Sequence, residues 1–189
     1  MFLRKAALRP IPPYAVVSSS AIEAVENTLD DDDEALQETL DRGYADMDRR
    51  QEALALYMAE KLALTGDELV QSLGYFLTIT VYLAFRESFP TRLEPVAEDA
   101  IELADQMLSV DEELRKGDPT EILDSDDVLA MGQPAILSYI QHHVHEALEQ
   151  SEGNVNVDQL DVIYRALLVL VIALSANVTS PTGEVPALD

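Results

Sequence analysis

Apolar residues recur along much of the chain at intervals of three and four, the spacing that places side chains on one face of an α-helix. The first such stripe spans residues 36–62 and consists of Leu36, Leu40, Tyr44, Met47, Leu54, Met58 and Leu62. It predicts either one long amphipathic helix from about 33 to 64 or two helices divided near Gly43. Thr65 and Gly66 mark the end of this stripe.

Two segments are apolar on nearly every side. They cover 73–85 and 166–176, which are 13 and 11 residues long. Because a membrane span needs about 20 apolar residues, we expect central core helices near 67–88 and 157–177, and no membrane segment. The β-branched residues of 78–81 favour a strand locally, but the helical pattern on both sides favours a helix.

Prolines, glycines and capping residues divide the rest of the chain. A short helix is predicted over 21–29, with Ser20 and Glu23 forming a capping box. Further helices are expected from about 95 to 117, over 125–131 and from 134 to about 150. The predicted fold is all-α, a single bundle of about five to seven helices.

The bundle domain is expected to cover residues 20–178. An irregular arm precedes it at 1–19, containing prolines and a quarter of the basic residues of the chain. A disordered tail with two prolines is expected at 179–189.

Two stretches of similar pattern suggest a faint internal duplication. Leu56–Met58 precedes a turn and then Asp67–Leu69, and Ser138–Ile140 precedes a turn and then Asp158–Leu160. Two helical hairpins would then pack together as a four-helix core. Amphipathic helices also resemble one another by chance, so both explanations stay open.

The charge sets this chain apart from an ordinary bundle. Asp and Glu number 36 against 12 Lys and Arg, giving a net charge of −24. Residues 26–52 carry −8 of it and residues 94–127 carry −11, outside the two most apolar segments. Such a field repels DNA, RNA and anionic lipid, so we expect no nucleic-acid or membrane partner. It attracts basic protein surfaces and divalent cations.

The three histidines lie within four residues of one another, on the helix predicted to begin at 134. At 100° per residue, one polar face of that helix contains His142, His145, Glu146 and Glu149. Imidazole and carboxylate one turn apart can bind a divalent metal, so these four residues are the candidate metal ligands. The alternative is a solvated face with His–Glu pairs, which the absence of a Glu-x-x-His motif favours.

The sequence contains few other residues or motifs that indicate catalysis or cofactor binding. The chain has no Cys, which excludes disulfides, thiolate zinc sites and cysteine nucleophiles. It contains no phosphate-binding glycine loop, nucleophile elbow or HExxH motif. A calcium loop is disfavoured because Ala35 stands where such a loop needs glycine, although acids occupy ligand positions at Asp30, Asp32, Glu34, Glu38 and Asp41. We therefore expect no cofactor and favour a non-enzymatic role over an enzyme.

Three functional hypotheses follow. The first is an acidic interaction protein, such as an adaptor, inhibitor or assembly subunit, that binds a basic protein surface; self-association as a homodimer also stays open. The second is adaptation to a salt-rich cytoplasm, where the charge serves solvation alone. The third is a metal-binding bundle. Because Arg9 and Pro10 interrupt the early apolar residues, no signal peptide is expected, which predicts a cytoplasmic protein.

Overall fold

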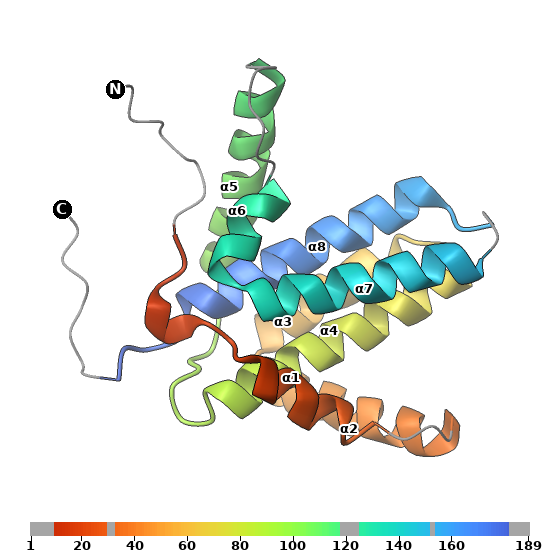
Figure 1. Cartoon of the computed structure of the whole chain (residues 1–189), viewed down its shortest axis with the longest axis horizontal. Coiled ribbons are helices and arrows are strands. Elements are labelled where there is room, and N and C mark those ends of the chain that lie inside the picture. The colour runs from red at the N-terminus through yellow and green to blue at the C-terminus, as the bar shows by residue number, and fades with distance from the viewer. Residues whose placement is uncertain (1–9, 30–32, 118–124, 152–153, 182–189) are drawn as a thin grey trace.

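The computed structural model describes residues 10–29, 33–117, 125–151 and 154–181. These residues form eight α-helices and no strand, so the prediction of an all-α helical bundle is confirmed. Figure 1 shows the helices: α1 (Ser19–Glu26), α2 (Asp33–Arg50), α3 (Glu52–Ala63), α4 (Glu68–Ser88), α5 (Glu98–Gly117), α6 (Ser125–Gly132), α7 (Pro134–Gln150) and α8 (Val157–Ala176). A 3₁₀ turn, η1 (Pro13–Ala15), precedes them.

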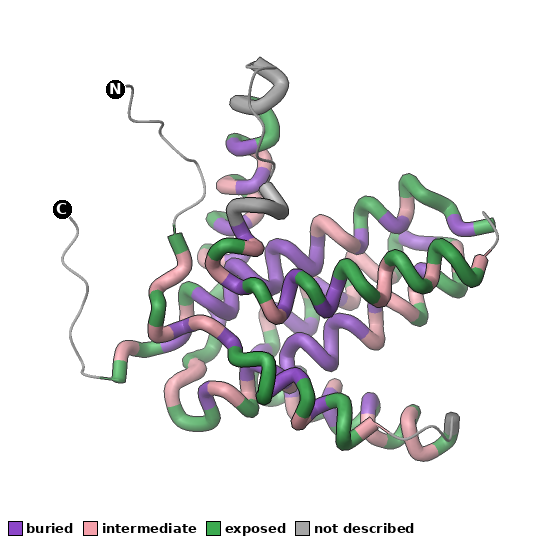
Figure 2. The backbone as a smooth tube through the Cα atoms, viewed as in Figure 1, coloured by how far each residue is buried: buried purple, intermediate pink, exposed green. Residues whose placement is uncertain are grey.

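The two predicted central helices are α4 and α8, which pack against each other in the middle of the molecule. All residues of 77–82 and of 166–175 are buried, and Figure 2 shows this core surrounded by more exposed helices. The β-branched stretch 78–81 is helical, as the pattern on both sides predicted. The Thr78 and Thr80 hydroxyls donate to the Gly74 and Phe76 carbonyl oxygens at 2.7 and 3.0 Å, so their burial leaves no hydroxyl unpaired.

By length and composition alone, α4 and α8 could each cross a membrane. Within this fold 56% of the apolar window of α4 and 67% of that of α8 are buried against other parts of the chain. The core helices of soluble bundles have the same character, because a helix that is apolar all round is buried in either setting.

The long stripe of residues 33–64 forms two helices, but the predicted division near Gly43 is wrong. The helix breaks at Gln51, whose φ of −137° and ψ of 49° separate α2 from α3. The buried side chain of Gln51 binds a distant segment: Nε2 donates to the Glu94 carbonyl oxygen at 3.0 Å, and Oε1 accepts from the Val96 N–H at 2.8 Å. These two bonds hold the extended chain that leads into α5.

The same arrangement occurs a second time at Gln133, between α6 and α7. Its φ and ψ are −134° and 61°, and its side chain is fully buried. Nε2 donates to the Ala15 carbonyl oxygen at 2.7 Å, and Oε1 accepts from the Val17 N–H at 2.9 Å. These bonds hold the extended chain that leads into α1.

The chain therefore folds as two similar halves that exchange segments. Each half runs from an extended segment through two helices to a buried glutamine, and then through a third helix to a long core helix. Each glutamine holds the extended segment of the other half. The similarity of Leu56–Met58 to Ser138–Ile140 agrees with this repeat, because both segments begin five residues after their glutamine.

Two details of the sequence-based prediction change. The residue that caps α8 as Asp67 caps α4 is Asn156, so the suggested match of Asp67–Leu69 to Asp158–Leu160 is two residues out of register. Ser18 caps α1 through a hydrogen bond from the Ala21 N–H at 3.3 Å, in place of the expected Ser20. The described part of the arm is ordered against the bundle, with Ala15 and Val17 buried. The basic residues Arg4, Lys5 and Arg9 lie outside the described residues, as does 182–189 of the tail.

Candidate functional site

The predicted metal ligands lie on the exposed face of α7, paired along the helix. His145 Nε2 is 3.2 Å from Glu149 Oε1, and His142 Nε2 is 4.0 Å from Glu146 Oε2. All four side chains are at least half exposed. Within the described parts of the chain, no group of three or more His, Asp or Glu side chains converges on a point that could hold a metal ion. The four predicted ligands thus form two His–Glu pairs, and Glu146 Oε2 also lies 3.9 Å from His143 Nδ1.

His143 is set apart from its neighbours by packing. Its ring meets Tyr139 edge-on at a centroid distance of 4.5 Å and Phe76 at 5.2 Å, and its Nε2 is buried without a hydrogen-bond partner. Burial, with His142 beside it, lowers the pKa of His143 below its ordinary value. The His143 ring is therefore packed between two aromatic rings at the edge of the core.

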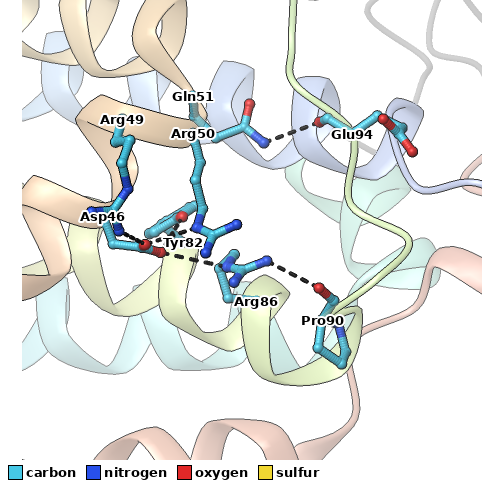
Figure 3. A network of polar contacts seen from close by, with 8 residues as sticks. All are labelled: Asp46, Arg49, Arg50, Gln51, Tyr82, Arg86, Pro90 and Glu94. Carbon is cyan, nitrogen blue, oxygen red and sulfur yellow. Dashed lines mark hydrogen bonds and ion pairs between the residues drawn. The ribbon is translucent and has the colours of Figure 1, made fainter.

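A polar network that the sequence did not indicate joins α2 to α4 (Figure 3). At its centre, Asp46 accepts hydrogen bonds from Arg49 at 2.6 Å, from Arg50 at 2.8 Å and from the Tyr82 hydroxyl at 2.8 Å. Arg86 approaches the same carboxylate at 3.5 Å and donates to the carbonyl oxygen of Pro90 at 3.2 Å. The network connects the end of α2 to the end of α4 and to the loop beyond it.

The electrostatics of this network suit a structural link. Burial opposes the charge of Asp46, but hydrogen bonds from Arg50, Tyr82 and Arg49 outweigh it and lower its pKa to about 2. Burial, together with the bond to Asp46, raises the pKa of Tyr82 above its ordinary value. Near neutral pH Asp46 is therefore ionised and Tyr82 protonated, so neither group is suited to proton transfer there.

An apolar groove with an acidic rim lies between α3 and α5. Its volume is about 300 Å³, and its floor includes Tyr57 and the buried Ile101. Leu56 projects at its edge with 56% of its surface exposed. Its carboxylates are those of Glu60, Glu98 and Glu102, all exposed. We call this the α3–α5 groove.

Asp105 and Arg165, whose charges act on Tyr57, are paired with each other. Arg165 on α8 bonds Asp105 at 3.0 Å and also contacts Glu112, both on α5. Burial raises the pKa of Tyr57 to about 12, with the charge of Asp105 adding to the effect and Arg165 opposing it. The Lys61 ammonium lies 5.1 Å from the centroid of the Tyr57 ring. The aromatic floor of the groove thus already contacts one cation.

A second groove lies between α1 and α7, with a volume of about 450 Å³. Its floor includes Ile22 and Tyr139, and its edge carries Ser138 and His142. Glu23 is the one carboxylate among the residues that line it. We call this the α1–α7 groove.

The sequence analysis did not predict either groove. Comparison with known proteins found no matching family model, curated protein or solved structure. The geometry and charge of this chain are therefore the guide to its function.

Proposed function

We propose that this chain is a non-enzymatic, acidic helical interaction protein, such as an adaptor, inhibitor or assembly subunit, that binds a basic surface of another protein. The observation that carries the proposal is the α3–α5 groove, which combines an exposed leucine with three exposed carboxylates. Apolar contact supplies affinity at protein interfaces, and charge around it supplies partner selection and fast association.

Two further features support a binding role over catalysis. The histidines of α7 pair with glutamates along the helix or pack in the core edge. The described carboxylate with the most strongly lowered pKa, Asp46, is committed to arginine and tyrosine partners. We infer a cytoplasmic protein that acts without a cofactor.

Affinity capture with a salt gradient tests the proposal. The immobilised chain, incubated with soluble protein at about 20 mM KCl, should retain basic proteins that elute as the salt rises through about 0.2–0.5 M. A matched control column carries a variant with Glu60, Glu98 and Glu102 changed to Gln. Retention of no basic protein by the unaltered chain would rule the proposal out.

A weak metal site on α7 is the second candidate, because one helical turn brings His145 Nε2 to 3.2 Å from Glu149 Oε1. A metal that binds only the folded state raises the melting temperature, by an amount that grows with the logarithm of the metal concentration divided by its dissociation constant. Zinc, iron, manganese and calcium are each titrated against the unaltered chain and against His145→Ala. A melting temperature that none of these metals changes would dismiss this candidate.

A further inference from the structure

Because the fold consists of two similar halves, the α3–α5 groove has an equivalent on the same molecule, the α1–α7 groove. Val17 and Val96 occupy the same place in their halves, because the N–H of each donates to the buried glutamine of the other half. Counting from them, Ile22 of α1 corresponds to Ile101 of α5. Counting from the glutamines, Tyr139 of α7 corresponds to Tyr57 of α3.

The floors of the α3–α5 and α1–α7 grooves are thus built from the same residue types at the same places. One rim carboxylate is also shared, Glu102 in the first groove and Glu23 in the second. The rims differ at three positions, where the α3–α5 groove has Leu56, Glu60 and Glu98 and the α1–α7 groove has Ser138, His142 and Ser19. The fold therefore contains two separate grooves whose floors are alike. Of the two, the α3–α5 groove is the one whose rim has an exposed leucine and three glutamates.

We propose that the α3–α5 groove docks a basic segment of a partner protein in which a large apolar side chain lies beside an arginine or lysine. Leu56, Glu60 and Glu98 distinguish it from the α1–α7 groove, and Leu56 and Glu60 are the two of these that lie on α3. This inference rests on the proposed function and adds the site and the chemistry of the segment that it accepts.

Charge complementarity decides the occupant. Three glutamates surround an opening in which Leu56 is exposed, so a segment that buried this leucine would bring its neighbouring side chains against carboxylates. A basic side chain gains from that position, whereas an acidic one is repelled. A volume of about 300 Å³ suits one or two side chains of a peptide, being at the lower limit of small-molecule pockets.

The contact between Lys61 and Tyr57 shows that this tyrosine ring already binds a basic side chain of the same chain. The ammonium lies 5.1 Å from the ring centroid, within the range of a cation–π interaction. A partner's basic side chain can reach the same ring from the groove side, flanked by Glu60. In the α1–α7 groove the position of Glu60 is taken by His142, which removes that carboxylate.

Peptide selection tests the proposal without a known partner. A random dodecapeptide phage library is selected on the full chain at about 20 mM KCl, and a peptide from the largest enriched group is labelled for fluorescence anisotropy. We expect enriched peptides to share a large apolar residue within four positions of Arg or Lys. Enrichment of peptides without basic residues, or no enrichment, would overturn the proposal.

Exchanging the two rims tests the site. The double variant L56S/E60H gives the α3–α5 groove two rim residues of its twin and should weaken peptide binding at least about tenfold. The reciprocal variant S138L/H142E should create a second binding site, raising the stoichiometry from one peptide per chain to two. All four substituted residues are exposed, so folding should persist, and circular dichroism checks this.

Two controls separate charge at the groove from charge in general. Glu98→Gln with Glu102→Gln removes two rim charges without touching Leu56 and should also weaken binding. Glu26→Gln with Glu38→Gln removes the same number of charges at positions on α1 and α2 outside the groove, and should leave the peptide affinity within twofold. Equal losses in the two pairs would overturn the site.

The capture experiment distinguishes this inference from the function on which it rests. If the unaltered chain retains basic proteins and L56S/E60H retains the same proteins equally, the groove is wrong and the proposed function stands. If the unaltered chain retains none, the proposed function itself fails.

Discussion

At the residue scale, two glutamines decide how the halves of the molecule are joined. Gln133 is fully buried and pairs with the Ala15 carbonyl, the Val17 N–H and the Ser175 hydroxyl. A buried amide that satisfies two backbone groups of a distant segment is not replaceable by an apolar side chain, because those groups would lose their partners.

We therefore expect Gln133→Leu to lower the free energy of unfolding by about 2–4 kcal/mol, the cost of leaving two buried backbone groups unpaired. Urea denaturation followed by circular dichroism measures it. Gln106→Leu, at an exposed position of α5, should change stability by less than about 0.5 kcal/mol. Equal effects of the two substitutions would contradict the role assigned to Gln133.

Asp46 gives the second prediction, because its pKa is about 2 in the folded chain against an ordinary value of 3.8. A carboxyl group with a lowered folded-state pKa stabilises the fold above its unfolded pKa and loses that contribution as the pH falls through the folded one. Relative to Asp46→Asn, the unaltered chain should be more stable by about 1–2 kcal/mol at pH 6, with the difference disappearing between pH 4 and pH 2. Denaturant melts of both proteins across that interval measure it, and a difference independent of pH would refute the assignment.

At the element scale, sequence pattern predicted the helices well where local signals mark their ends. Pro134 begins α7, and the central helices α4 and α8 lie within a residue of their predicted limits. The break at Gln51 was missed because its cause is a bond to a segment 43 residues away, which no local pattern reveals. The exposed His–Glu pairs of α7 follow from helical periodicity, whereas the grooves need the packing of helices distant in sequence.

One signal for the grooves was nevertheless present. Ala21–Glu23 and Ala100–Glu102 have the same sequence, Ala-Ile-Glu, at equivalent places in α1 and α5. With the similarity of 56–58 to 138–140, it could have paired the two halves from sequence alone. What it could not show is that α1 packs beside α7 and α5 beside α3, since each groove is made by helices of different halves.

Gly43 shows how a residue taken for a helix break can instead serve helix packing. It lies inside α2, where a Cβ would stand 2.5 Å from Ile79 Cγ2 and 3.3 Å from Leu83 Cδ1 of α4. An alanine inside a helix is normally favoured over glycine by about 1 kcal/mol. The branched Ile79 side chain is fully buried and has no room to move away from an added methyl group. The cost of this steric overlap should therefore exceed the gain in helix propensity.

We expect Gly43→Ala to destabilise the fold by about 1–3 kcal/mol in spite of its gain in helix propensity. Gly66→Ala is the matched control, since no atom lies within 4 Å of a Cβ built there. Thermal unfolding of both variants gives the comparison. A Gly43→Ala protein as stable as the unaltered chain would mean that α2 and α4 can separate at this crossing without loss.

At the scale of the whole molecule, repulsion between negative charges opposes folding and burial of the apolar core favours it. A net charge of −24 on 189 residues produces self-repulsion that salt screens, whereas the buried core around α4 and α8 is indifferent to salt. The interaction hypothesis and the salt-adaptation hypothesis differ on which quantity decides folding in dilute buffer. An interaction protein must be folded there to select its partner by charge, and a protein adapted to a salt-rich cytoplasm need not be.

We expect the core to prevail. The fold is held by contiguous buried stretches in both central helices and by hydrogen bonds at Gln51, Gln133 and Asp46. We expect these contacts to form without added salt, because burial of apolar surface does not need screening. Helical circular dichroism and thermal melts from about 10 mM to 2 M KCl should show a folded protein throughout, with a melting temperature that rises and then levels off as the repulsion is screened within a few ångströms. Loss of helical signal in dilute buffer that returns with KCl would instead assign the charge to solvation, and the acidic rim of the α3–α5 groove would then lose its value as a guide to a partner.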